Sequence, residues 1–275
     1  MGLMQVKLIT KVKPVYYPQN TQSSIKRMNL SLLDTKEWMV VDEDFQQFSQ
    51  HKQETLCKSY YAMDQSIDAQ HELHNILLEH LVNDHDCYTY NGTDYLEHNT
   101  GIGWNTTNKD LYSSSKWVQE DICILQPVQG EYRLTAASVC SPSSWVLEEK
   151  MGKTITEIHS PVPDFDKVVA KRLETFLRAL KPENPVMRYN WSYSKNNELS
   201  QRPDVSVEQN GRYWRVERQT MRKLPATGAI VFTIRIFIHP IEQLGEQANQ
   251  DLTELFSRLP QEELEYKNIS EGELC

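Results

Sequence analysis

Five strand-like segments, interrupted once by a helical stretch, follow one another between residues 121 and 239, and this order limits the fold more than any other feature of the chain. The first two, at 121–126 and 132–140, are short and apolar and are separated by Pro127 and Gly130, which favours a hairpin-like pair. Three more strands are expected at 187–193, 213–220 and 229–239. Runs of strands on both sides of a helix predict an α+β fold with an antiparallel sheet.

Two of these elements carry a clear hydrophobic period. Residues 163–180 form the most amphipathic helix that the sequence predicts, and Pro182 stops it. Its apolar stripe consists of Phe165, Val168, Val169, Leu173, Phe176, Leu177 and Leu180. The strand at 229–239 alternates strictly, and one face carries Ile230, Phe232, Ile234, Ile236 and Ile238. Each stripe marks a surface that another element is expected to cover.

Residues 1–120 are expected to form an arm and a helical extension packed on the body. The apolar spacing predicts helices at 42–58 and 64–83. Residues 84–116 are polar and contain three glycines, which is typical of a long surface excursion. Because a structureless loop of this length is unusual, we expect local structure or a lid role there.

The remaining chain divides into a core at 121–245 and an acidic C-terminal helix and tail at 246–275. A short helix at 144–151, closed by Gly152, is expected within the core. We interpret the three parts as one continuous globular unit.

Composition excludes several classes of protein. With 39% hydrophobic and 24% charged residues, the chain is globular rather than disordered. Its 38 acidic and 29 basic side chains give a formal charge of -9, which argues against a nucleic-acid or anionic-membrane partner. No apolar run has the length of a membrane span, and no signal peptide is recognisable. Five scattered cysteines without a CxxC pair favour a reducing compartment, so we expect a cytoplasmic protein.

Motifs for common cofactors are absent from the sequence. Gly101 and Gly103 lack the third glycine of a dinucleotide fingerprint, and there is no P-loop, GxSxG elbow or cysteine cluster. A redox role would therefore need electrons from another polypeptide. His71 and His74, spaced i,i+3 on a helix, could bind a metal, but no third ligand is specified, and a solvated helix face is the commoner role of such residues.

His159 has the most unusual setting of the histidines, within EIHSPVP at 157–163. The two prolines fix φ and remove two backbone donors, so the segment is a stiff lead into the helix that follows. A rigid loop beside an apolar helix stripe suits an axial ligand of haem, because one ring nitrogen binds iron while a neighbour holds the other. The alternative is a loop histidine that is hydrogen-bonded to the backbone.

Three arginines on predicted strands are candidates for anion binding. Arg218 shares a face of its strand with Trp214 and Val216. If that face is inward, the buried cation needs an anionic partner, either a haem propionate or an internal Glu or Asp. Arg235 lies off the isoleucine face of the last strand, and Arg188 forms a third polar position.

Five ordered motifs give the chain a resemblance to a known family. They are PSSW at 142–145 with EKMG at 149–152, IHSPVP at 158–163, RYNW at 188–191, VERQT at 216–220 with LP at 224–225, and FTIR at 232–235. In this series the chain resembles the haem-dependent oxidative N-demethylase α-subunit-like family, over roughly residues 121–245.

The resemblance implies a PAS-like core, an antiparallel sheet of about five strands with helices over one face. It also implies a b-type haem (haem b) whose iron has His159 as its proximal ligand. Arg188 and Arg218 are then the expected cofactor-binding residues. Arg218 and Arg235 are the expected catalytic residues, as donors on the propionate or oxygen side.

The family's activity implies a monooxygenase that oxidises a small alkylamine with O₂ and releases formaldehyde. Electrons would come from separate flavin and iron–sulfur reductase subunits, and a folate-linked partner would take the formaldehyde. Glu217 is a candidate for holding the amine only if its strand face is inward, which conflicts with Trp214 and Val216 being inward. A non-catalytic haem sensor of O₂, CO or NO is a rival function on the same scaffold, and a cofactor-free interaction protein is a third.

Overall fold

The computed structural model describes residues 29–160, 162, 165, 167–206, 208–267 and 269. The strands in these residues are β1 (Ser31–Leu32), β2 (Tyr60–Ala62), β3 (Tyr88–Tyr90), β4 (Tyr95–His98), β5 (Gly103–Asn105), β6 (Asp121–Val128), β7 (Glu131–Ser138), β8 (Val186–Ser194), β9 (Tyr213–Lys223) and β10 (Ile230–Pro240). They form a seven-stranded sheet in the order β1-β8-β9-β10-β6-β7-β2 and a three-stranded sheet in the order β3-β4-β5.

All five strands expected from the sequence are present, and they are neighbours in the large sheet. Every pairing is antiparallel, which confirms the α+β class and the type of sheet. The sheet has seven strands rather than about five, because β1 pairs with β8 and β2 pairs with β7 at the two edges. These edge strands have two and three residues, too few to show a period of two in the sequence.

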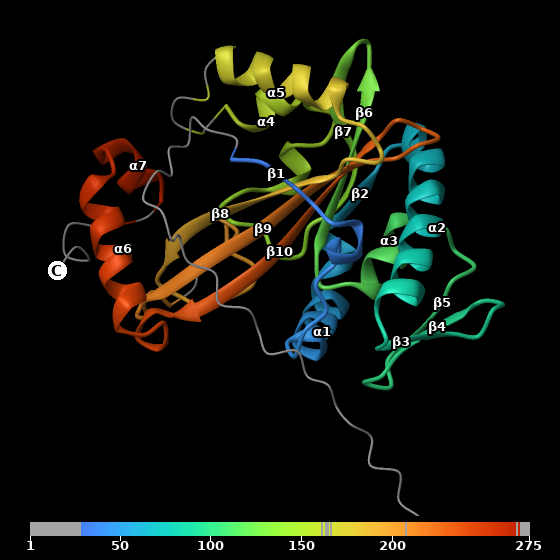
Figure 1. The fold of residues 1–275 in the computed structure, drawn as a ribbon, viewed down its shortest axis with the longest axis horizontal. Coiled ribbons are helices and arrows are strands. Elements are labelled where there is room, and N and C mark those ends of the chain that lie inside the picture. Colours follow the sequence, from blue (N-terminus) through green and yellow to red (C-terminus); the bar gives the residue numbers. More distant parts are fainter. Residues whose placement is uncertain are drawn as a thin grey trace, which may run out of the picture.

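The helices are distributed around this sheet (Figure 1). The α-helices are α1 (Phe45–Thr55), α2 (Ile67–Asp84), α3 (Leu111–Ser114), α4 (Ile155–Ile158), α5 (Lys167–Ala179), α6 (Glu246–Arg258) and α7 (Gln261–Tyr266). The 3-10 helices are η1 (Thr35–Glu37), η2 (Leu56–Lys58), η3 (Asp64–Ser66), η4 (Ser115–Trp117), η5 (Leu147–Glu149) and η6 (Ile241–Gln243). The helices expected at 42–58 and 64–83 correspond to α1 with η2 and to η3 with α2.

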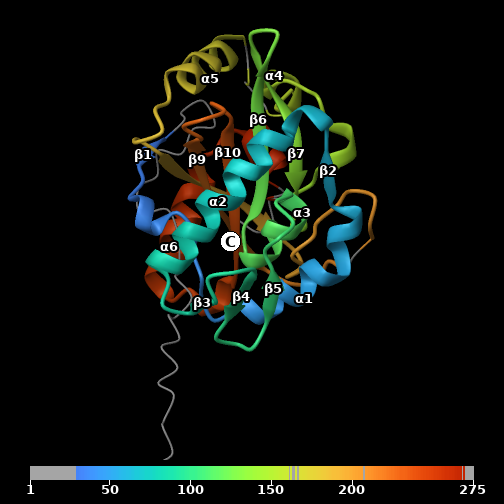
Figure 2. The same ribbon diagram turned by 90° about the vertical axis from the view of Figure 1, so that its right-hand side faces the viewer.

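Both faces of the large sheet are covered, so the expectation of helices over one face was wrong. On one face, Leu73 of α2 belongs to the same buried cluster as Val231 of β10. On the other face, Leu177 of α5 belongs to a cluster with Ile230. Adjacent residues of a strand point to opposite sides, so the two clusters are separated by the sheet. We call these sides the α2 face and the α5 face; Figure 2 shows α2 crossing in front of β6 and β10.

The C-terminal helices cover the far end of the sheet (Figure 1). Leu252 and Phe256 of α6 form a third buried cluster with Trp214 and Phe237 on the α2 face. The backbone nitrogen of Tyr193 donates to the Lys267 carbonyl oxygen at 3.2 Å, which fixes the end of α7 beside β8. The acidic tail expected to be helical is therefore part of the folded body as far as α7.

Two segments that the sequence leaves irregular or weakly helical have defined local structure. Local structure within 84–116 is confirmed, since β3, β4, β5 and α3 lie there and Leu96 and Leu111 are buried. The helix expected at 144–151 is only the single turn η5. Ser144 has φ of 60°, which is incompatible with a right-handed helix, and Gly152 with φ of 73° ends the segment.

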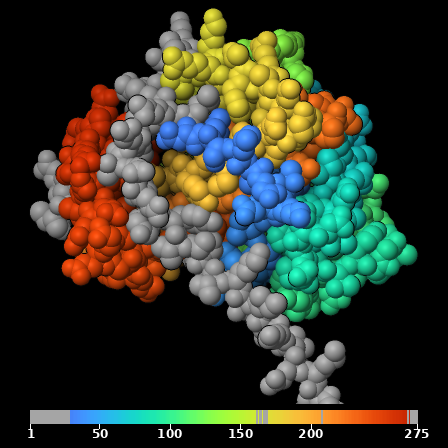
Figure 3. Space-filling view, viewed as in Figure 1, coloured from blue at the N-terminus to red at the C-terminus, as the bar shows by residue number. Residues whose placement is uncertain are grey.

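The segment from residue 29 onward packs on the core, as expected for the N-terminal part. The space-filling view of Figure 3 shows its blue residues between the yellow region of α5 and the teal region of α2. The described residues do not include positions 1–28 of the predicted arm. They also lack positions 161 and 163 of the IHSPVP motif and position 164 directly after it. No helix among the described residues is long and apolar enough to cross a bilayer.

Candidate functional site

His159 follows α4 and is held by that helix. Thr154 begins α4 with a capping box, in which its side chain and that of Glu157 each bond the other's backbone. His159 Nδ1 lies 2.8 Å from the Ile155 carbonyl oxygen, and because a carbonyl only accepts, Nδ1 carries the proton. Nε2 forms no hydrogen bond to a described residue and is the nitrogen with the free lone pair.

The surroundings of His159 keep its ring oriented and neutral. The ring stacks on Phe165 with centroids 4.8 Å apart and an interplanar angle of 20°. Burial lowers the pKa of His159, the Ile155 hydrogen bond opposes this, and the positive charges of Arg188 and Lys150 lower the pKa further. A neutral imidazole with one nitrogen held and the other free is the form that binds a metal.

Arg188 lies near this histidine on the α5 face of β8. Burial lowers the pKa of Arg188, while the carboxylate of Glu217 raises it. Its Nε is buried and has no hydrogen-bond partner among the described residues. A buried guanidinium donor without a partner costs free energy, so this position favours an anionic ligand.

Apolar side chains line the same side of the sheet as the two polar residues. They are only partly buried and pack against the core beneath α5; they include Trp145, Met151, Ile158, Leu173, Phe176 and Phe232. Five separate elements or loops supply them. Partly exposed apolar side chains beside a histidine and an arginine form a surface that suits a flat apolar ligand with anionic substituents.

The α5 face of β8 and β9 continues as a polar surface. Asn190 Nδ2 and Gln219 Nε2 donate to the same carboxylate oxygen, Oε2 of Glu217, at 3.2 and 2.7 Å. In the register of β9 with β10, Ile236 lies opposite Glu217 and Ile234 opposite Gln219. The isoleucine face expected for the last strand thus lies beside this polar surface, on the same side of the sheet.

Arg218 lies on the α2 face, with 3% of its surface exposed. Its Nη1 donates to the Trp38 carbonyl oxygen at 3.1 Å, and its Nη2 donates to the carbonyl oxygen of Glu37. The partner is therefore neither a propionate nor a carboxylate but two backbone carbonyls of the segment before α1. The structure does not bring Arg218 together with His159, because the sheet lies between them.

Arg235 is fully buried and forms an internal ion pair. Its Nη2 lies 2.8 Å from both carboxylate oxygens of Asp42, and the guanidinium stands 4.1 Å from the centroid of the Phe48 ring. Arg235 shares the α2 face with Arg218, its partner in the β9–β10 register. The sequence left two partners open for a buried arginine, a haem propionate or an internal acid. Arg235 has the internal acid.

The histidine pair of α2 is divided between surface and core. His71 is exposed, whereas His74 is buried and its ring lies 4.8 Å from that of Trp117. Among the described residues there is no group of three or more His, Cys, Asp or Glu side chains that could hold a metal ion.

Acid is expected to destabilise the protein through two buried histidines. Burial lowers the pKa of His74 and of His98 to about 4, below their ordinary value of 6.5. Between pH 6.5 and 4 the unfolded chain therefore binds more protons than the folded one, so the free energy of unfolding decreases as the pH falls. Urea unfolding at several pH values measures this slope, and His74→Gln should reduce it. An unchanged slope in that variant would contradict the assignment.

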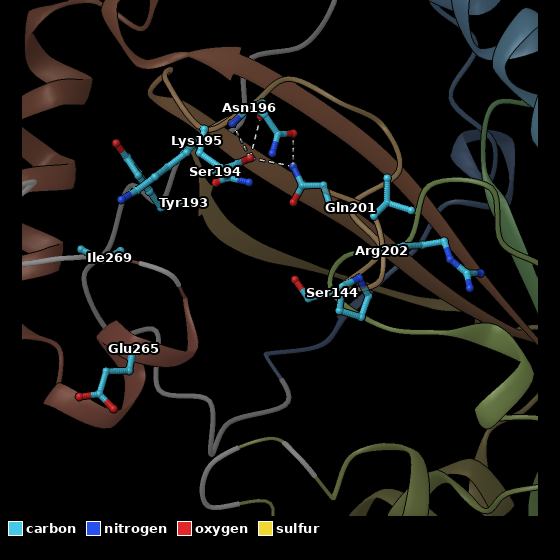
Figure 4. Close-up of a pocket in the computed structure, with 12 residues that line it drawn as sticks. Ser144, Tyr193, Ser194, Lys195, Asn196, Gln201, Arg202, Glu265 and Ile269 are labelled. Atoms are coloured by element: carbon cyan, nitrogen blue, oxygen red, sulfur yellow. Dashed lines mark hydrogen bonds between the residues drawn. The ribbon is translucent and has the colours of Figure 1, made fainter. Parts of the chain in front are cut away.

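A separate hollow of about 550 Å³ lies beyond the polar surface, between the end of β8, the loop after it and α7 (Figure 4). Ser194 Oγ donates to the Asn196 carbonyl oxygen at 2.6 Å and accepts from Gln201 Nε2 at 2.7 Å. His159, Arg188, Arg218 and Arg235 do not line it. This hollow is therefore distinct from the site around His159.

Sequence reasoning left Lys150 out of the site and set Glu217 aside. Lys150 is part of the EKMG motif, but nothing in the motif indicates that its charge acts on His159. Glu217 was set aside because one buried face was assumed for the strand. The available signal that both faces are covered was in β10, where Val231 and Phe237 lie on the side opposite the isoleucine face.

A family model described as haem-dependent oxidative N-demethylase, alpha subunit-like, matches residues 29–273. This range extends well beyond the motifs at 121–245 and includes β1, α1, α2 and the C-terminal helices.

Proposed function

We propose that this chain, which belongs to the haem-dependent oxidative N-demethylase, alpha subunit-like family, binds a b-type haem through His159 and oxidises a small alkylamine with O₂. The family description names the cofactor and a subunit role. The identity of the iron ligand, the type of haem and the amine substrate are our inference from the residues at the site.

The observation that supports the proposal is the pairing of His159 with Arg188 on the α5 face. The free Nε2 of a neutral imidazole suits an iron ligand, and the unpartnered buried Nε of Arg188 suits a propionate. Partly buried apolar side chains lie on the same face of the sheet. The residues present therefore fit a haem.

When bound, the haem supplies the chemistry with O₂, and the protein supplies position and electrostatics. His159 keeps its proton on Nδ1, held by the Ile155 carbonyl, so Nε2 stays available throughout. Arg188 and Lys150 place positive charge near the ring, which opposes protonation of His159. The apolar side chains under α5 exclude water from this part of the sheet.

The strand order supports the PAS-like core. Numbered along the chain from β6 to β10, the five long strands lie in the order 2-1-5-4-3, with the first and last adjacent at the centre.

An alpha subunit implies other subunits, which agrees with electrons reaching the site from separate flavin and iron–sulfur polypeptides.

Formaldehyde release is the expected result when the haem-loaded protein is reduced chemically in the presence of O₂ and a small amine. One oxygen atom ends in formaldehyde and the other in water, with two electrons and two protons taken up. A panel containing dimethylamine and trimethylamine, assayed for formaldehyde and O₂ consumption, measures this, with haem-free protein as the control.

Two other outcomes would contradict the proposal. Stable O₂ or NO binding without formaldehyde, and without any amine-induced spectral change, would favour the haem sensor. A folded protein that takes up no added haem would exclude both haem functions.

A further inference from the structure

We propose that Glu217 binds the ammonium group of the amine substrate, through a carboxylate that Asn190 and Gln219 hold in place. The inference rests on the proposed function, because it assigns a residue to the substrate of that reaction. In the proposed function, Glu217 has no role in holding the haem.

Glu217 occupies a singular position in the sheet. It is the only acidic residue on β8, β9 and β10, all of whose residues the structure describes. It is half-buried and lies on the α5 face, the same side as Arg188 and the segment that carries His159. Since both sheet faces are covered, the inward position of Trp214 and Val216 does not turn Glu217 to the solvent.

The hydrogen bonds of the carboxylate orient it and leave one oxygen open. Asn190 and Gln219 both donate to Oε2. Oε1 has no hydrogen bond to a described residue, so it can accept one from a ligand. A carboxylate fixed by two amides loses little side-chain freedom when it binds a cation, which favours recognition.

The positive groups near Glu217 have other partners. Arg215 donates to the hydroxyl of Ser143 and to the backbone carbonyls of Ser141, Glu198 and Leu199. Lys267 Nζ donates to the Trp191 carbonyl oxygen at 2.7 Å and stands 3.9 Å from the centroid of that ring. In the proposed function Arg188 is bound to a propionate. The Glu217 carboxylate is then left without a counterion, and the ammonium group of a substrate can supply one.

The remaining neighbours suit an alkylated ammonium ion. Ile236 lies opposite Glu217 in the register of β9 with β10 and belongs to a buried apolar cluster with Phe48 and Leu199, so one side of Glu217 is apolar. Tyr266 at the end of α7 lies near this position: burial raises the pKa of Tyr266, and the negative charge of Glu217 raises it further. A small cation with alkyl groups therefore fits this corner better than a strongly hydrated metal ion or a large anion.

Glu217→Gln is expected to raise the Kd for dimethylammonium on the haem-loaded protein by about 10- to 100-fold, because a charge-assisted contact is lost. Calorimetric titration of the ferric protein measures this binding without turnover. The glutamine keeps an oxygen that can accept from Asn190 and Gln219, so the fold and the haem spectrum should be unchanged. Glu217→Asp, which keeps the charge, should recover part of the affinity.

Two controls separate this inference from a general disturbance. Glu262→Gln removes an exposed carboxylate of α7 and should leave the amine affinity as it is. Cyanide, an anionic iron ligand, should bind the Glu217→Gln protein as well as the wild type.

The outcomes for the two proposals can be distinguished. If the wild type binds dimethylammonium and the Glu217→Gln protein binds it equally well, the role of Glu217 is wrong even if formaldehyde is released. If binding depends on Glu217 but no amine yields formaldehyde, the proposed reaction is wrong and the ammonium site stands. A wild type that binds no amine at all would overturn the site itself.

Discussion

Replacing His159 by alanine is expected to abolish stoichiometric haem binding. The imidazole is held by the Nδ1 contact with Ile155 and by stacking on Phe165. Loss of the side chain removes the proposed iron ligand and leaves only the apolar surface and Arg188. Titration of the apoprotein with haemin, followed by the Soret band, measures the stoichiometry and affinity.

The matched control is His71→Ala, which removes an exposed histidine of α2 and should leave the spectrum unchanged. Adding imidazole to the His159→Ala protein should restore part of the ferrous spectrum if the defect is the missing ligand alone. A His159→Ala protein with the wild-type ferrous spectrum would move the ligand elsewhere. His239 is then the next candidate, although it lies on the α2 face, in register with Trp214.

The regular part of the fold could be predicted because its elements are long enough to show a period. The strands β6 to β10 have 8 to 11 residues, and the stripe of α5 recurs over several turns. The edge strands β1 and β2 and the small sheet β3-β4-β5 have two to four residues each. Such short strands depend on their partners, which no local pattern reveals.

The candidate site was partly predictable for a different reason. A histidine in a proline-stiffened segment and an arginine on a strand can be recognised as candidates, and His159 and Arg188 do lie close together. Successive residues of a strand point to opposite sides of the sheet, so the sequence shows that Arg218 shares a face with Trp214 and Val216. What the sequence could not show is that Glu37, Trp38 and Asp42, far away in the chain, satisfy the two arginines of the α2 face.

Replacing Asp42 by alanine is expected to lower the free energy of unfolding by about 3–5 kcal/mol, because it leaves the fully buried Arg235 without its counterion. Asp42 also accepts from Gln119 Nε2 at 2.8 Å, so the change disrupts a second buried contact. Urea unfolding measures the loss. Glu148→Ala, which removes an exposed partner of Arg202, is the matched control and should cost about 0–1 kcal/mol.

A double variant, Asp42→Leu with Arg235→Met, decides between the two roles considered for Arg235. Replacing a buried ion pair by apolar residues of similar volume is often neutral or stabilising, so the double variant should regain most of the stability lost in Asp42→Ala. If Arg235 only joins β10 to the segment before α1, the stable double variant also keeps haem and amine binding, since the sheet separates the pair from His159. If the double variant is stable but no longer binds haem or amine, Arg235 acts on the site across the sheet. The assignment of the functional site to the α5 face would then be wrong.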